Sequence, residues 1–173
     1  MGYRPGAEHR REGAVVTWAP PSARDRLGIL TSSRSVAIVG ASNNPSRASY
    51  FVGTYLLASS DFTVWFVNPR EETILGHVAY GSLADLPEAP DIVVVFRKPS
   101  DLPEVLDEAL ACNAKTLWLQ LGIEDPDIAE RASEGGLNVV MNRCIKIEHA
   151  RFHGGLHLAG FNTGVISSRR SLA

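Results

Sequence analysis

One loop of the sequence combines the residue types that proteins use to hold a phosphate group. Gly40 follows a short apolar run, and Ser42, Pro45 and Arg47 stand between it and a segment with helical spacing. Glycine permits a tight turn and a close approach of the backbone to a ligand. The free N–H groups at a helix start bind anions, and a guanidinium group suits phosphate. An ordinary strand–helix turn can use similar residues, so the phosphate interpretation also depends on the position of this loop after the first predicted strand.

Two later loops carry further cations behind apolar runs. The second strand is followed by Asn68, Pro69 and Arg70, and the third ends at Phe96 before Arg97. The first loop is not the G-x-G-x-x-G fingerprint, and no acidic residue stands at the end of the second strand to bind a bare ribose. An asparagine and an arginine there suit a phosphorylated ribose, such as the 2′-phosphate of NADP or the 3′-phosphate of coenzyme A (CoA). Both loops can also be read as plain turns.

Alternating apolar and helical segments must position these loops. Continuous apolar runs predict strands buried on both faces, over residues 35–39, 63–67, 92–96, 116–119 and 138–141. Helical spacing predicts helices over residues 22–30, 47–59, 101–112 and 125–134. Parallel neighbours need a crossover helix, so the alternation predicts a doubly wound α/β fold in which ligands bind beyond the carboxyl ends of the strands. A small strand over residues 77–80 and one helical turn near residue 84 interrupt this pattern.

Composition and charge exclude several classes of protein. The chain has 173 residues, of which 45% are hydrophobic and 21% charged, as in an ordinary globular domain. Its net charge of −2 argues against a nucleic-acid binder, and it has no apolar run of the roughly 20 residues that span a membrane. The polar N-terminus does not resemble a secretory signal. Cys112 and Cys144 predict reduced thiols in a cytoplasmic protein.

Three segments are expected along the chain. Residues 1–21 predict a flexible or loosely docked tail, and residues 22–150 the folded domain. Residues 148–173 are rich in glycine and read as irregular, so residues 151–173 are expected to form an irregular extension.

Several stretches, taken in order, resemble one known family. They are residues 36–42 (VAIVGAS), 45–47 (PSR), 67–69 (VNP), 118–122 (WLQLG) and 140–148 (VMNRCIKIE). This pattern resembles the small CoA-binding domain proteins of bacteria and archaea, which are stand-alone relatives of the CoA-binding domain of the succinyl-CoA synthetase α-subunit. The resemblance covers about residues 24–155 and implies a three-layer, Rossmann-like fold with a five-stranded parallel core sheet.

The same resemblance implies a CoA site built from the loops after four strands. The first loop is expected to hold the diphosphate, the second the 3′-phosphate, the third the adenine and ribose, and the fourth the pantetheine. In that order, the expected ligand residues are Gly40, Ala41, Ser42, Pro45, Arg47 and Ser49; Asn68, Pro69 and Arg70; Val95, Phe96 and Arg97; and Gln120 and Gly122. The family usually has proline where this chain has Ala48, a mild departure.

We find no catalytic or metal-binding constellation in the sequence. The synthetases use a phosphorylated histidine in a separate domain, for which this chain is too short. His149, His153 and His157 recur every fourth residue, but Gly154 interrupts a helix there, and we expect surface histidines without a metal. Cys144 is expected to be buried in the last strand region rather than to react with a thiol.

These observations favour non-catalytic binding of CoA or acyl-CoA. The alternatives are an NADP-dependent oxidoreductase, for which no Tyr-x-x-x-Lys pair is present, and a nucleotide-binding regulatory or interaction subunit. The expected partner is a small CoA molecule or thioester, with no nucleic acid and no membrane. A protein partner or a homo-oligomer stays open.

Overall fold

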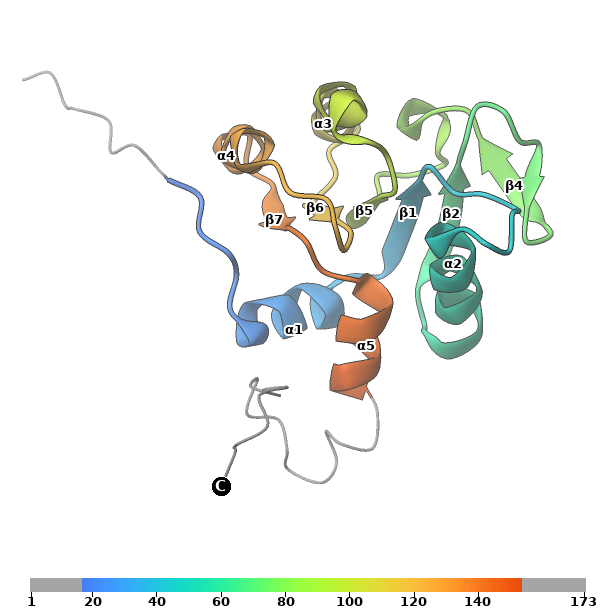
Figure 1. Ribbon diagram of the computed structural model, residues 1–173, viewed down its shortest axis with the longest axis horizontal. Helices are drawn as coiled ribbons and strands as arrows, with labels where there is room; N and C mark the ends of the chain where they lie inside the picture. The colour runs from blue at the N-terminus through green and yellow to red at the C-terminus, as the bar shows by residue number, and fades with distance from the viewer. Residues whose placement is uncertain (1–16, 154–173) are drawn as a thin grey trace, which may run out of the picture.

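A single mixed sheet forms the centre of the protein (Figure 1). The computed structural model describes residues 17–153, and the sheet order is β3-β4-β2-β1-β5-β6-β7. Neighbouring strands are parallel except for β3 and β4, which pair in antiparallel fashion. The strands are β1 (Ser35–Val39), β2 (Thr63–Val67), β3 (Thr73–Ile74), β4 (His77–Tyr80), β5 (Ile92–Val95), β6 (Thr116–Leu119) and β7 (Asn138–Val140).

The five predicted core strands are confirmed as β1, β2, β5, β6 and β7. The continuous apolar runs predicted these strands correctly because the strands are buried on both faces. Strands β1, β5 and β6 are buried along their whole length. The short strand over residues 77–80 is confirmed as β4, which extends the parallel part of the sheet beyond β2. The antiparallel strand β3 has only two residues and was not predicted.

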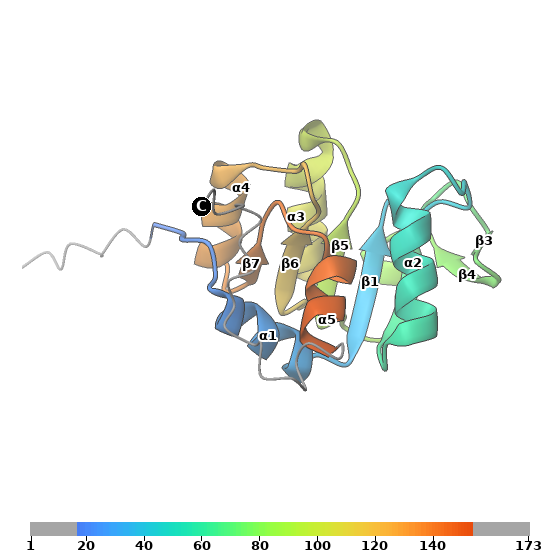
Figure 2. The same ribbon diagram turned by 60° about the horizontal axis from the view of Figure 1, so that its bottom comes forward.

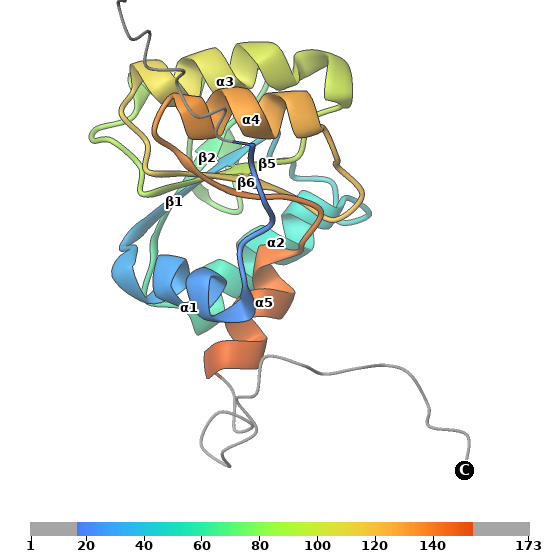
Figure 3. The ribbon, with the colours of Figure 1, turned by 90° about the vertical axis from the view of Figure 1, so that its left-hand side faces the viewer.

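Helices cover both faces of the sheet, which confirms the three-layer α/β prediction (Figure 3). Helices α3 and α4 pack on one face, and α1, α2 and α5 pack on the other. Successive strand residues alternate between the two cores: Val39 faces α3 and α4, whereas Ile38 faces the other layer. The helices are α1 (Ala23–Ser32), α2 (Ala48–Ser59), α3 (Leu102–Ala111), α4 (Pro126–Glu134) and α5 (Ile145–His153), with short 3-10 turns at Leu83–Asp85 and Pro99–Asp101.

Helix α5 corrects the expectation of irregular structure from residue 148. Its residues Ile145, His149 and Phe152 recur at helical spacing and are buried against the sheet and α2. This packing stabilises a helix that ends at His153, directly before Gly154. His149 is only 4% exposed, so the expectation of a surface histidine was wrong for this residue, whereas His153 is exposed. His157 lies outside the described residues.

The segment before α1 contacts the far edge of the sheet. The indole Nε1 of Trp18 donates a hydrogen bond to the carbonyl oxygen of Val139 in β7, at 3.4 Å. Helix α1 then begins with a capping box, in which Ser22 and Asp25 bond each other's backbone N–H groups. Among residues 17–153, no helix is long and apolar enough to cross a membrane.

Candidate functional site

The turn after β1 requires glycine for two reasons. Gly40 has φ +81°, and a Cβ atom at this position would lie 2.5 Å from the carbonyl oxygen of Phe96. Its N–H group also donates to the carbonyl oxygen of Val67, at 3.0 Å. The backbone of this turn therefore passes close to the ends of both neighbouring strands, β5 and β2, at the carboxyl edge of the sheet.

Hydrogen bonds within the protein shape the loop that follows. The Ser42 hydroxyl oxygen accepts from the N–H of Asn44, whose own side-chain oxygen accepts from the N–H of Ser46. The Asn43 side chain donates to the carbonyl oxygen of Thr73 in β3, at 2.6 Å. The loop is thus held in one shape before any ligand arrives, and the asparagine side chains that hold it were not singled out from the sequence.

Asn68 has a positioning role that its residue type alone did not show. Its Nδ2 donates to the carbonyl oxygen of Ala41 at 2.8 Å, and its Oδ1 accepts from the N–H of Arg70 at 2.9 Å. Both ends of the amide are thereby engaged by the protein. Asn68 ties the loop after β2 to the loop after β1, so that Arg70 faces the same hollow.

The loops after β1, β2, β5 and β6 surround a cleft with a volume of about 560 Å³. Nine of the fourteen residues expected from the sequence line it, from three of these loops and the start of α2. The lining consists of Gly40, Ala41, Ser42, Arg47, Ala48, Ser49, Asn68, Arg70, Phe96, Arg97 and Ile123.

The other five expected residues lie outside this lining: Pro45, Pro69, Val95, Gln120 and Gly122. Val95 is completely buried within β5, and Gln120 is buried beyond the end of β6. Gly122 has φ +87° and donates its N–H to the side-chain oxygen of Asn142 at 2.7 Å, which links the loops after β6 and β7. Ile123 follows this turn and lines the cleft, but it was not predicted from the sequence. Its position in the loop after a parallel strand could have indicated that it lies near the ligand site.

The electrostatics of the cleft favour an anion. Arg47 and Arg70 are exposed and Arg97 is half-buried, and none of the three forms an ion pair with another residue in the described part of the chain. Helix α2 begins beside them with no side-chain cap and no acidic residue in its first turn. The start of helix α2 and the three guanidinium groups therefore give the cleft a positive lining.

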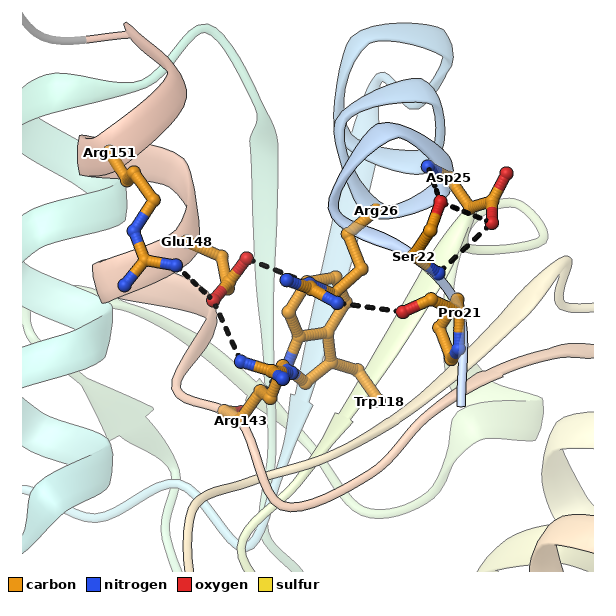
Figure 4. Close-up of polar contacts among 8 residues, drawn as sticks. All are labelled: Pro21, Ser22, Asp25, Arg26, Trp118, Arg143, Glu148 and Arg151. Carbon is orange, nitrogen blue, oxygen red and sulfur yellow. Dashed lines mark hydrogen bonds and ion pairs between the residues drawn. The ribbon is translucent and has the colours of Figure 1, made fainter. Parts of the chain in front are cut away.

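A second arginine cluster lies between α1 and α5 (Figure 4). The Arg26 Nε lies 2.9 Å from Glu148 Oε2, and both side chains are less than 10% exposed. Arg143 and Arg151 approach the other oxygen of Glu148 at 3.5 and 3.4 Å. Arg26 also donates to the carbonyl oxygen of Pro21, at 2.7 Å. This cluster joins residues that are 122 positions apart in the chain, and Glu148 is the countercharge of the buried Arg26.

The histidines of α5 form a contact network with α2. His149 Nδ1 lies 2.9 Å from the Tyr55 hydroxyl, and the His149 ring stacks on His153 with 4.1 Å between centroids. Burial, followed by the charge of His153, lowers the pKa of His149 below its usual value.

Within residues 17–153, no group of three or more potential ligands is arranged to hold a metal ion. Cys144 is partly buried in the turn before α5, beyond the last strand, and it and Cys112 are free thiols.

The fold and the cleft define a doubly wound α/β protein with an anion-accepting hollow at the carboxyl edge of its sheet. The chain belongs to the CoA-binding domain family, whose model matches residues 34–150. The resemblance noted in the sequence is thereby confirmed, and membership supports binding of CoA in general.

Relatives of two kinds match the chain. It is 35% identical to the uncharacterized protein YneT of Bacillus subtilis, over 75% of this chain and 96% of that protein. A hypothetical protein from Pyrococcus horikoshii has the same fold, with a TM-score of 0.73 and 35% identity over 79% of this chain and 98% of the other. The chain is also 26% identical to the α-subunit of an ADP-forming acetate–CoA ligase of Pyrococcus furiosus, over 70% of this chain but only 29% of the subunit.

Proposed function

We propose that this protein binds CoA or an acyl-CoA thioester in the cleft at the carboxyl edge of the sheet, without catalysing a reaction of its own. The observation that carries the proposal is the set of three arginines, Arg47, Arg70 and Arg97, that line the cleft and form no ion pair with a carboxylate of residues 17–153. CoA carries a diphosphate and a separate 3′-phosphate, and so offers anionic groups to match such spaced cations.

The diphosphate is assigned to the start of α2. The uncapped N–H groups of this helix, the backbone after Gly40 and the Arg47 guanidinium meet there. A phosphate group would complete the hydrogen bonds that the helix leaves open. Ser42 and Ser49 also line the cleft, and a serine hydroxyl can donate a hydrogen bond to a phosphate oxygen.

The adenosine half is assigned to the loops after β2 and β5. Phe96 offers an apolar surface to the adenine ring, and Arg97 lies beside it in the lining. Arg70 is exposed in the cleft lining, and Asn68 accepts a hydrogen bond from its backbone N–H. We assign the 3′-phosphate to Arg70, because the cleft has a cation here where a bare ribose would require an acidic residue.

The residues around the cleft support binding rather than catalysis. Of the described residues that line it, none is a histidine, cysteine, lysine, tyrosine or acidic residue, so the lining offers Ser42 and Ser49 no side chain that could act as a general base. The chain also spans less than a third of the ligase α-subunit to which it is similar. We propose that it performs the CoA-binding part alone, as a reduced-thiol protein of the cytoplasm.

Thermal unfolding with a panel of ligands tests the proposal. A ligand present at 100 times its Kd stabilises the folded state by about 2.7 kcal/mol and raises the melting temperature. We expect a clear rise with CoA or acetyl-CoA and a smaller one with dephospho-CoA and NADP. A rise with NADP alone would instead indicate an oxidoreductase cofactor site. No rise with any of them would contradict the proposal.

A further inference from the structure

A second hollow crosses the sheet at its amino edge, opposite the cleft. Its larger part, of about 650 Å³, lies where the strands begin, and Ser35 of β1 and Thr63 of β2 line it. Its smaller part, of about 360 Å³, lies beside the last turn of α3, where Cys112 lines it. Glu88 and Ala89 line both parts, so the two adjoin. We call them together the amino-edge hollow.

The part beside α3 is apolar, with two carboxylates in its lining. Leu83, Leu86 and several alanines line it together with Glu88 and Glu108. Glu108 Oε2 accepts from the N–H of Leu83 at 3.2 Å, and neither carboxylate forms an ion pair within residues 17–153. Apolar surface gains free energy when it leaves water, and the two carboxylates attract positive charge. This part therefore suits an apolar segment that carries cations.

The part along the strands has a different charge. Asp91 lines it, but Lys115 Nζ pairs with Asp91 Oδ1 at 2.7 Å. Arg34 lines the same part and forms none of the ion pairs found in the described stretch of the chain. The charge along the hollow thus changes from positive at the strands to negative beside α3. A segment that fits should carry no cation along the strands and its cations beside α3.

The residues after α5 have this order of charge. Residues 154–168 contain no lysine, arginine, aspartate or glutamate, and Arg169 and Arg170 follow them. No acidic side chain occurs anywhere in residues 154–173. Apolar side chains precede the two arginines, among them Phe161, Val165 and Ile166. The sequence therefore offers apolar groups first and cations afterwards, in the order that the hollow requires.

Helix α5 ends beside the amino-edge hollow. It runs from the carboxyl edge toward the edge where β1 begins (Figure 2). The centroid of the His149 ring lies 5.6 Å from that of Phe62, and the next residue, Thr63, lines the hollow. Residues 154–168 can span about 50 Å when extended, at about 3.3 Å each, whereas four neighbouring strands cover only about 15 Å. The residues after His153 can therefore reach both parts of the hollow.

We propose that residues 154–173 dock in the amino-edge hollow of their own chain. Residues 154–168 lie along the strands and fill the apolar part beside α3, and Arg169 and Arg170 pair with Glu88 and Glu108. The segment is tethered to the fold, so its effective concentration favours the same chain over a second copy. When docked, it covers the thiol of Cys112. The proposal concerns the edge opposite the cleft and does not depend on the ligand.

Alkylation of the two cysteines in the full chain tests the proposal. Cys112 lines the hollow, whereas Cys144 lies in the turn before α5, at the carboxyl edge. With iodoacetamide, and mass spectrometry to follow each thiol separately, Arg169→Glu combined with Arg170→Glu should make Cys112 react about fivefold faster, which corresponds to about 1 kcal/mol. Loss of nearby positive charge alone would slow a thiolate, so a faster reaction reports uncovering. An unchanged rate at Cys144 excludes a general loss of stability.

Two controls match this variant. Arg10→Glu combined with Arg11→Glu makes the same change in net charge near the other end of the sequence, and the Cys112 rate should stay at its wild-type value. Glu88→Arg should expose Cys112 by itself. Glu88→Arg combined with both reversals at residues 169 and 170 should return the rate toward wild type, because the charges are then exchanged.

Three results would overturn the proposal. The first is an unchanged Cys112 rate after the reversals at residues 169 and 170. The second is a faster rate after the reversals at residues 10 and 11, which would assign the hollow to the N-terminal segment. The third is protection of Cys112 that increases with protein concentration, which would identify a second copy as the occupant.

Discussion

The protein has two arginine clusters that differ in how their charge is compensated. Between α1 and α5, the buried Arg26 and its neighbours Arg143 and Arg151 all approach one carboxylate, Glu148. At the carboxyl edge, the three arginines of the cleft form none of the ion pairs found among residues 17–153. In the first cluster the buried arginine, Arg26, has a countercharge within the chain, whereas the arginines of the cleft have charge available for a ligand.

The two helix N-termini near these clusters show the same contrast. Helix α1 begins with a capping box from Ser22 and Asp25, which satisfies its first N–H groups internally. Helix α2 has Arg47 at its N-cap position and no side-chain cap. Internal compensation therefore marks the part of the molecule that holds the fold together, and its absence marks the part that we assign to the ligand.

The largest effect is expected at the buried ion pair of Arg26 and Glu148. Glu148→Gln leaves Arg26 buried without a countercharge, and we expect the free energy of unfolding to fall by about 3 kcal/mol in urea denaturation. Replacing both partners, as Arg26→Met with Glu148→Leu, should recover most of this loss because no charge then stays buried. A fall of less than about 1 kcal/mol for Glu148→Gln would contradict the structural role of the cluster.

Arg47→Ala should produce the opposite pattern. Because the side chain is exposed and forms none of the ion pairs found among residues 17–153, the free energy of unfolding should change by no more than about 0.5 kcal/mol. CoA affinity, measured by calorimetry, should weaken by more than about 1 kcal/mol through loss of a charge-assisted phosphate contact. Arg24→Ala removes an exposed arginine from α1 and is the matched control for net charge. Equal affinities of wild type and Arg47→Ala would place the diphosphate elsewhere.

Arg70→Ala refines the assignment within the cleft. We expect its CoA affinity to fall by about 1 kcal/mol, with little change for dephospho-CoA, which lacks the 3′-phosphate. The comparison of the two ligands in one titration series separates a local contact from a general loss of positive charge. If both ligands lost affinity equally, the 3′-phosphate would not be at Arg70.

A further contrast between the two regions is the pH dependence of stability on the side of α5. Because the pKa of His149 is lowered by burial, the unfolded chain binds its proton first as the pH falls through about 6.5. The free energy of unfolding therefore has its full value above that pH. Below it, the free energy of unfolding decreases by at most about 1.4 kcal/mol per pH unit for one proton. His149→Gln should reduce this slope between pH 7 and 5, whereas His77→Gln, at an exposed position, should not. Equal slopes in all three proteins would rule out this contribution.

Local signals in the sequence predict much of this molecule. The core strands were recognisable because residues such as Val36 and Ile38 lie in runs buried on both faces. Gly40 was recognisable because glycine permits a tight turn between a strand and the helix that follows it. The structure confirms such a turn, in which Gly40 has φ +81°. These features depend on residues close together in the chain.

Features that depend on distant residues were not predictable in the same way. Helix α5 was not predicted because its buried side includes a charged residue, Glu148, and therefore does not form an apolar pattern in the sequence. The partner that allows Glu148 to be buried, Arg26, lies 122 residues away. The role of Asn68 depends on a carbonyl oxygen in another loop. Residue type indicates that an asparagine can bind a ligand, but only the fold shows that its amide is already used by the protein.

The most direct test of the account is a crystal structure of the protein with CoA bound. We predict the diphosphate at the start of α2, within hydrogen-bond distance of its N–H groups and Arg47. The 3′-phosphate should lie beside Arg70. A diphosphate bound outside this cleft, with Arg47 and Arg70 facing solvent, would contradict the central claim that uncompensated charge marks the ligand site.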